Sequence, residues 1–355
     1  MTTVDETTDA YRQIIDATPR ERLELFLTTA NRMGAPVGNV EKDFWVCWTL
    51  NVLYGRLPPG SPRLLFKGGT SLSKAYGLIR RFSEDIDITV FRDDLGQAAS
   101  IEELRALSNK KRRGRLDAIR NACRGYITGP LRQALSEALA KDVGAGQVEI
   151  DADDPDGQTL QVWYPAVEPT EGGYVRPAVR IEAGAKSALD PNRPALIRPY
   201  IADEALDLDL AVAGVTTIEP GRTFWDKVVI VHGLRRWYER RGALRQEGQR
   251  ISRHYYDLHC LMGTEIADAA IRDQALAIDC VAHARMFFAR PHYDLVSASP
   301  GTFAIAPLGS MVESLRRDYE NTAAMIFGKP PEFEDIIVSM QRLDAAVNGQ
   351  GRQVS

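Results

Sequence analysis

The sequence predicts an α+β protein in two parts, a domain of helices and strands over residues 1–215 and a mainly helical domain over residues 216–355. Short apolar runs bounded by Gly, Pro and Asp, which are typical of strands, are found in the first part. Helix-period apolar residues continue almost to the end of the second part. Pro220 and Gly221 mark the junction.

The predicted elements follow from apolar spacing and turn residues. The second predicted helix is apolar enough to be mostly buried. Three strand patterns, within "QVEIDADDPDG", "TLQVWYPAV" and "PAVRIEAG", come after the charged helical region. The elements before them are helices at 8–31 and 40–55, a strand at 63–67, a helix at 71–79, a strand at 84–91 and a helical region at 101–142.

Composition excludes several classes of protein. The 355 residues are enough for a sizeable core, and a net charge of −4 does not by itself indicate nucleic-acid binding. The four cysteines have no zinc-like spacing, which favours buried thiols in a reducing compartment. The first residues lack the pattern of a signal peptide, and no apolar run is long enough for a membrane helix. We therefore expect a cytoplasmic protein without a membrane partner.

Two aspartates lie inside a predicted strand. The period of two places Asp85 and Asp87 on one face, while Ile86 and Ile88 point to the core. Two carboxylates about 6–7 Å apart repel each other when both are ionised, and a divalent cation between them removes the repulsion. Mg²⁺, or Mn²⁺ in its place, binds few protein carboxylates together with phosphate oxygens. The alternative is a solvated polar face.

A double glycine precedes the acid pair. Gly68 and Gly69 stand between a strand and a helix, where backbone N–H groups can approach a phosphate. Thr70 or Ser71 is expected to cap the helix and to add a hydroxyl donor. The alternative is an ordinary glycine turn. Together with the acid pair, the turn predicts a site for a nucleotide and a metal ion.

A third carboxylate is expected on a neighbouring strand. Glu182 alternates with the apolar Val179 and Ile181, so it lies on the polar face of its strand. A cross-strand salt bridge to a basic neighbour is the alternative role for Glu182. Asp151 is a competing candidate, but its Asp-rich surroundings resemble a loop.

The second part contains a lysine among apolar residues. Lys227 lies beside the stripe formed by Phe224, Val228 and Val231, where it either extends to solvent or binds phosphate. Arg253 and Asp257 are four residues apart on a predicted helix, so a local ion pair between them is one expectation.

Two segments are strongly basic, although the net charge of the whole chain is negative. Five of the seven residues at 109–115 are basic, and residues 234–253 contain seven arginines against two glutamates. Arginine binds phosphate well, and nearby aromatic residues offer stacking surfaces for RNA bases. These aromatic residues are Trp237, Tyr238, Tyr255 and Tyr256. The alternative is that both segments are solvated helix faces.

The sequence "FKGGTSLSKAYGL", followed by "RFSEDIDI", resembles the first motif of the AbiEii/AbiGii and MenT nucleotidyltransferase-like toxins of the DNA polymerase β superfamily. Fifteen residues between Gly69 and Asp85 exceed the usual superfamily spacing, and the "RFSEDID" ending is typical of the AbiEii branch. "TFWDK", "RHYYDL" and the C-terminal sequence resemble later motifs of the family. The resemblance covers most of the chain from "EKDFW" onwards, and no motif is found at 95–175.

The resemblance implies a polymerase β-like domain with a mixed sheet, followed by the helical domain. It also implies roles for individual residues. Lys227 would bind nucleotide phosphates, and Asp257 would either orient Lys227 or act as a base. The implied catalytic residues are Asp85, Asp87, Lys227 and Asp257, and the implied metal ligands are Asp85, Asp87 and Glu182. The implied nucleotide-binding residues are Lys67, Gly68, Gly69, Thr70, Ser71, Ser83, Lys227 and Arg253.

These features lead to the hypothesis of an Mg²⁺-dependent nucleotidyltransferase toxin. It would transfer NMP from NTP to RNA, at the 3′ end of tRNA, and so block translation. The family implies a separately encoded antitoxin as partner. One alternative is an NTP-dependent transferase that acts on a protein or a small molecule. Another is a non-catalytic nucleotide-binding module.

Overall fold

The computed structural model describes residues 4–83, 85–167, 176–245 and 250–349. It confirms an α+β protein, whose chain divides into two compact units. Unit 1 comprises Met1–Ala75, Phe82–Ala99 and Asn109–Ile218; unit 2 comprises Tyr76–Arg81, Ser100–Ser108 and Glu219–Ser355. Two short segments, Tyr76–Arg81 and Ser100–Ser108, thus belong to unit 2 before the chain continues into it at Glu219. The boundary after residue 215 stays a prediction.

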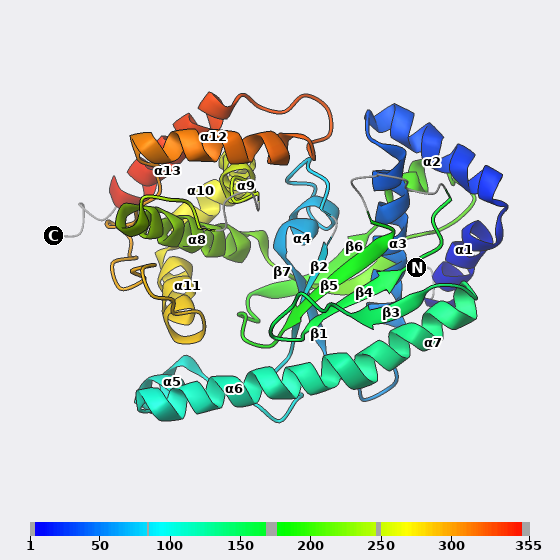
Figure 1. Ribbon diagram of the computed structural model, residues 1–355, viewed down its shortest axis with the longest axis horizontal. Coiled ribbons are helices and arrows are strands. Elements are labelled where there is room, and N and C mark those ends of the chain that lie inside the picture. The colour runs from blue at the N-terminus through cyan, green and yellow to red at the C-terminus, as the bar shows by residue number, and fades with distance from the viewer. Residues whose placement is uncertain (1–3, 84, 168–175, 246–249, 350–355) are drawn as a thin grey trace. The chain divides into compact units, whose positions relative to one another are not determined.

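Unit 1 contains a mixed seven-stranded sheet in the described ranges, with the order β3-β4-β5-β2-β1-β7-β6. The pairs β1·β7 and β2·β5 are parallel and the other pairs are antiparallel. Figure 1 shows the strands as one sheet with α3 beside it. The strands are β1 Leu64–Lys67, β2 Asp85–Val90, β3 Gln147–Ile150, β4 Thr159–Trp163, β5 Ala178–Gly184, β6 Asn192–Ile197 and β7 Val212–Ile218.

Strands β6 and β7 were not expected from the sequence. Half of the residues of β6 are exposed, and the strand contains Pro194, which is tolerated because β6 is an edge strand. Their pairing is also irregular between Ala195 and Ile197. Neither strand therefore shows the regular alternation that identifies β2 and β5.

The helices of unit 1 surround an aromatic core on α3. Phe44, Trp45 and Trp48 are at most 1% exposed, which confirms that this helix is buried. The helix expected at 8–31 is instead two helices, because Thr18 and Glu21 form a capping box that starts a new one. The helices are α1 Val4–Asp16, α2 Pro19–Met33, α3 Val37–Gly55, α4 Gly68–Lys74, α6 Asn109–Tyr126, η1 Ile127–Leu131, α7 Arg132–Asp142 and η2 Tyr200–Asp203.

Unit 2 is helical, and α8 packs against α9, α10 and α11. Phe224, Val228 and Val231 of α8 are fully buried, as the apolar stripe predicts. Residues Leu315 and Tyr319 of α12 also lie in the core. The helices are α5 Ile101–Ala106, α8 Pro220–Arg241, α9 Arg253–Met262, α10 Glu265–Arg272, α11 Gln274–Phe287, α12 Gly309–Ala323 and α13 Phe333–Gly349.

All four cysteines are free thiols, and only Cys260 is not fully buried. This outcome confirms the expectation of buried thiols. Among the helices of the described ranges, none is both long and apolar enough to cross a membrane.

A buried carboxylate at the end of α7 joins three elements of unit 1. Asp142 accepts hydrogen bonds from Arg12 Nε (3.0 Å) and Trp48 Nε1 (3.0 Å), and Arg56 binds both of its oxygens. Its side chain is completely buried. Although burial alone would raise the pKa of Asp142, Arg56 and Arg12 lower it below its usual value.

We expect Asp142→Asn to lower the free energy of unfolding by about 3 kcal/mol, because two partly buried arginines lose their counter-charge. Asp9→Asn is the control: Asp9 also contacts Arg12, but its side chain is 66% exposed, so its loss should cost less than about 1 kcal/mol. Urea denaturation measures both. Since the folded-state pKa of Asp142 is lowered, its contribution is present above about pH 4 and is lost at more acidic pH. Equal effects of the two substitutions would contradict this expectation.

Candidate active site

The acid pair lies on the polar face of the sheet in unit 1. Ile86 and Ile88 are fully buried, whereas Asp85 and Asp87 are half-buried on the opposite face. This arrangement confirms the alternation predicted for the strand.

The register of the sheet places charged residues beside both aspartates. Asp87 lies opposite Lys67 of β1 and Glu182 of β5, and Asp85 lies opposite Arg180 of β5. Lys67 Nζ is 3.5 Å from Asp87 Oδ1. The polar face of three neighbouring strands therefore carries three carboxylates and two cations. These five residues form the acid-pair site.

Glu182 is bound by a cation in its own strand. Arg180 donates to the Glu182 carboxylate and, over 2.9 Å, to Asp151 Oδ2. Burial alone would lower the pKa of Arg180, but Glu182, Asp151 and Asp85 together raise it. Glu182 thus forms a salt bridge, but its partner Arg180 is on the same strand, so the expected cross-strand bridge is not the one observed. Asp151 lies in the same network and not beside the acid pair.

Gly68 is in direct contact with the acid pair. Its φ of +76° is a conformation that side chains disfavour, and a Cβ at this position would lie 2.1 Å from Asp87 Oδ2. Only glycine allows the backbone to pass this close to the carboxylate. The turn thus brings backbone and carboxylate together, as a site for a metal-bound phosphate requires.

The hydroxyl groups of the turn are already used within the protein. Thr70 donates to the Asp85 carbonyl and lies 2.6 Å from Ser83 Oγ. Ser71 donates to the Gly68 carbonyl over 2.9 Å. Helix α4 begins at Gly68, so the predicted cap by Thr70 or Ser71 is wrong. The Thr70 hydroxyl instead fixes the turn against the start of β2, and the Ser71 hydroxyl forms a hydrogen bond within the turn.

A buried ion pair lies behind this turn. Lys74 Nζ, at the end of α4, is 2.7 Å from Asp43 Oδ1 of α3 and 3.8 Å from the ring centre of Tyr200. Asp43 also accepts a hydrogen bond from the Tyr200 backbone. Burial would lower the pKa of Lys74, but Asp43 raises it, so the ammonium stays charged. This pair anchors α4, and the "EKD" and "LSK" sequences did not reveal it.

Unit 2 contains a buried cluster of two cations around one carboxylate. Lys227 Nζ is 2.7 Å from Asp257 Oδ2, and Arg81 binds Asp257 with Nε at 2.7 Å and Nη2 at 2.9 Å. Asp257 is 0% exposed, and Lys227 and Arg81 are about equally inaccessible at 6% and 5%. Arg81, Lys227 and Asp257 form the lysine cluster.

Two sequence expectations for these residues are wrong. Lys227 does not extend to solvent, and the partners of Asp257 are Arg81 and Lys227 in place of the exposed Arg253. Arg81 was missed by sequence reasoning. Its signal was its place at the start of the "RFSEDID" sequence, in which no role was assigned to the arginine.

The charges of the cluster do not balance. Burial lowers the pKa of Lys227, and Arg81 lowers it further, against the opposing effect of Asp257. Burial would raise the pKa of Asp257, but the two cations hold it well below its usual value. With Asp257 ionised and both cations protonated, the cluster carries one net positive charge. Such a site attracts an anion.

The stacking residues expected near the arginines are mostly in the core. Tyr238, Tyr255 and Tyr256 are 7%, 1% and 2% exposed, so they offer no open surface to RNA bases. Trp237 is half-buried against Arg241 and Arg245.

We expect Gly68→Ala to destabilise the protein by about 1–3 kcal/mol more than Gly96→Ala, because the new Cβ collides with Asp87. Gly96 is the matched control: its φ is +66°, but nothing lies within 4 Å of an added Cβ. Chemical denaturation of both variants measures the difference. Equal losses would show that Gly68 is needed only for its backbone conformation.

The comparison with protein-family models agrees with these motifs. The family model described as the nucleotidyl transferase AbiEii toxin of type IV toxin–antitoxin systems matches residues 51–348. A search of curated proteins found no match. Among solved structures, MenT4, a nucleotidyltransferase toxin from Mycobacterium tuberculosis H37Rv, is similar with 18% identity and a TM-score of 0.41 over 93% of this chain and 96% of that chain. Because the family model covers most of the sequence, the chain belongs to the AbiEii family of nucleotidyltransferase toxins.

Proposed function

We propose that this toxin transfers NMP from NTP to an RNA acceptor, the 3′ end of tRNA, and thereby blocks translation. The observation that carries the proposal is the register of the acid-pair site. It aligns Asp87 with Lys67 and Glu182 directly above the Gly68 turn. In this reaction an RNA hydroxyl attacks the α-phosphorus and gives up its proton to water, a new P–O bond forms, and pyrophosphate leaves as the bond between the α-phosphorus and the bridging oxygen breaks.

Asp85 and Asp87 are the residues that would hold Mg²⁺ or Mn²⁺. The donor set fits, since Mg²⁺ takes one or two protein carboxylates and completes its shell with phosphate oxygens and water. When bound, the ion neutralises phosphate charge and stabilises the attacking and leaving oxygens. The described residues include no group of three or more potential ligands arranged for a metal. Glu182, the third proposed ligand, lies beside Asp87 but is bound by Arg180.

The backbone of the glycine turn and Lys67 are proposed to bind phosphate. Gly68 and Gly69 begin α4, and the Lys67 side chain is partly exposed next to Asp87. Thr70 and Ser83 are proposed to support the site indirectly, since their hydroxyls are bonded to each other or to the backbone. The same holds for Ser71.

Lys227 is proposed to bind nucleotide phosphate, with Asp257 as its positioning residue. A general base works best with a pKa near the working pH, whereas the pKa of Asp257 is far below it. Both of its oxygens are also occupied by Arg81 and Lys227. The orienting role is therefore favoured over the role of base. Arg253, exposed on the same helix, is proposed as a further phosphate contact.

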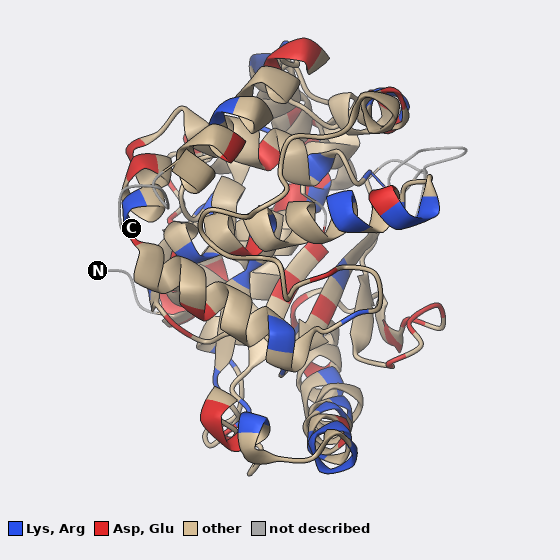
Figure 2. Cartoon of the chain, turned by 90° about the vertical axis from the view of Figure 1, so that its left-hand side faces the viewer, with Lys and Arg blue, Asp and Glu red and all other residues tan. Residues whose placement is uncertain are grey.

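Exposed cations support an RNA acceptor. Lys110 and Arg113 on α6 are exposed, and Figure 2 shows the basic residues gathered along this helix. The last turns of α8 are less available, because Arg235 and Arg236 both pair with Glu239. The partner implied by the family is an antitoxin, and NTP is the implied substrate.

We expect label from one α-³²P NTP to enter tRNA when the protein is incubated with Mg²⁺, total tRNA and each NTP in turn. Asp85→Asn/Asp87→Asn should reduce this transfer by about 1,000-fold or more, because the metal contributes several kcal/mol to the transition state. Asp93→Asn/Asp156→Asn, which removes two solvent-exposed carboxylates of unit 1, is the matched control. Transfer that persists without the acid pair would refute its role. No transfer from any NTP to tRNA would refute the proposed acceptor.

We expect NTP affinity to fall with rising pH before the pH reaches the usual pKa of a lysine, because the pKa of Lys227 is lowered. The positive charge is present below this lowered pKa and is lost above it. Calorimetric titration at several pH values measures the effect. Lys227→Met should weaken binding by about tenfold or more at neutral pH. In Lys227→Arg the charge persists to high pH, so an identical decline in that variant would contradict the assignment.

A further inference from the structure

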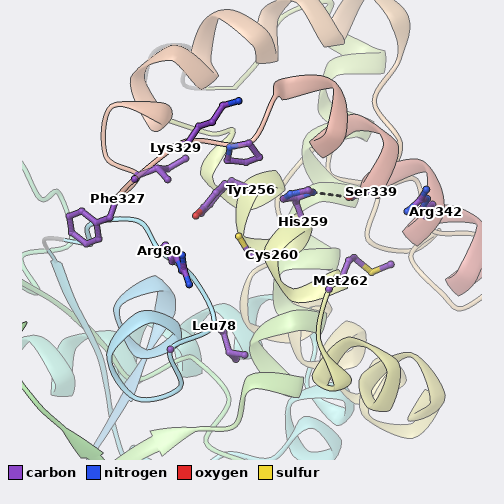
Figure 3. Close-up of a pocket in the computed structure, with 15 residues that line it drawn as sticks. Leu78, Arg80, Tyr256, His259, Cys260, Met262, Phe327, Lys329, Ser339 and Arg342 are labelled. Carbon is purple, nitrogen blue, oxygen red and sulfur yellow. Dashed lines mark hydrogen bonds between the residues drawn. The ribbon is translucent and has the colours of Figure 1, made fainter. Parts of the chain in front are cut away.

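Unit 2 contains a pocket of about 600 Å³ that the proposed reaction does not use. It is lined by residues of the 76–81 segment, of α9 and α13, and of the sequence between α12 and α13 (Figure 3). None of the 15 described residues that line it is Asp or Glu. Three cations do line it: Arg80, Lys329 and Arg342.

The three cations are accessible from solvent. Arg80 and Arg342 are exposed. Lys329 lies 3.7 Å from Glu332, and both side chains are at least 70% exposed, so solvent screens this ion pair and leaves the lysine available. In a chain with a net charge of −4, a pocket with three cations and no carboxylate is locally positive. It suits an anionic ligand.

The wall between the cations is uncharged. Figure 3 shows Tyr256 between Lys329 and Arg80, next to the hydrogen bond of 2.8 Å that joins His259 and Ser339. Burial lowers the pKa of His259, which keeps the imidazole neutral at neutral pH. Burial also raises the pKa of Cys260 to about 11, so this residue is a thiol and not a nucleophile. The wall between the cations therefore adds no negative charge that would repel a phosphate.

The pocket and the lysine cluster share two chain segments. Arg81 binds Asp257, whereas its neighbour Arg80 lines the pocket. On α9, Asp257 belongs to the cluster, and Tyr256, about 100° away around the helix, lines the pocket. The backbone of Arg80 is also fixed, since its carbonyl accepts from Phe327 N over 2.8 Å. A ligand in the pocket therefore lies on the adjacent face of the helix that positions Lys227.

We propose that this pocket binds a nucleoside phosphate, whose phosphate oxygens contact Lys329, Arg342 and Arg80. Two sources share this chemistry: the terminal nucleotide of the RNA acceptor and a free mononucleotide. The RNA source rests on the proposed function, and the pocket itself does not. An acidic peptide would also bind to the cations, but nucleoside phosphates are the substrates of a nucleotidyltransferase, the family to which the chain belongs.

The test measures binding, so it is independent of transfer. The full-length protein is titrated into a 5′-fluorescein-labelled oligoribonucleotide with a free 3′-OH, and anisotropy is followed at several salt concentrations. Unlabelled oligoribonucleotide, AMP, inorganic phosphate and poly-glutamate serve as separate competitors. Lys329→Gln/Arg342→Gln removes two charges from the pocket. The control, Arg105→Gln/Arg272→Gln, removes two exposed charges of unit 2 outside it.

We expect the pocket variant to bind the oligoribonucleotide about tenfold more weakly or worse, and the control to bind within about twofold of the parent protein. The slope of log affinity against log salt should become shallower by about 1.4, since each phosphate contact on single-stranded RNA contributes about 0.7. Displacement by oligoribonucleotide but not by AMP identifies the chain end as ligand. Equal displacement by AMP identifies a free nucleotide.

Unchanged affinity for both ligands in a folded pocket variant would overturn the proposal, as would competition by poly-glutamate alone. Thermal unfolding checks the fold, and Arg80→Gln, at an exposed side chain, repeats the test if the double variant is unstable. The same titration with Asp85→Asn/Asp87→Asn should show intact RNA binding. If no NTP labels RNA while the pocket variant still loses binding, the proposed function fails and the pocket assignment stands.

Discussion

The pairing of β2 with its two neighbours is the constraint on which the acid-pair site depends. Burial of Ile86 and Ile88 fixes which face of β2 is polar, because a shift by one residue would place both aspartates in the core. Antiparallel pairing with β1 then brings the Gly68 turn under Asp87, and parallel pairing with β5 brings Glu182 beside it. The positions of Asp85 and Asp87 thus follow from the packing of Ile86 and Ile88 on the opposite face of the sheet.

In unit 2, a buried carboxylate holds two cations in fixed positions. Asp257 is completely buried, which would be costly without Arg81 and Lys227 on its two oxygens. One carboxylate shared by two cations leaves a net positive charge whose position is set by helices α8 and α9. A buried and oriented ammonium loses little conformational freedom when it meets a phosphate.

Two pairs of adjacent residues connect the lysine cluster with the pocket of unit 2. Arg80 and Arg81 are adjacent in the chain, yet one lines a pocket and the other lies in the buried cluster. Tyr256 and Asp257 are divided in the same way. Two short segments therefore serve both a buried electrostatic site and an open basic pocket. A change that moves one of the segments is expected to disturb both.

The sequence by itself determined the elements with strong local signals. Alternation in β2 and β5, the apolar stripe of α8 and the glycine turn were readable, because each depends on spacing within a few residues. Tertiary structure alone decided the partners of the charged side chains. Asp257 pairs with Arg81, which is 176 residues away, and not with Arg253 one turn earlier on α9. Asp257 and Arg81 are both buried, whereas Arg253 is exposed. Contacts across the fold likewise determine the ion pair between Lys74 and Asp43 and the pairing of β6 with β7. No local sequence pattern indicates such contacts.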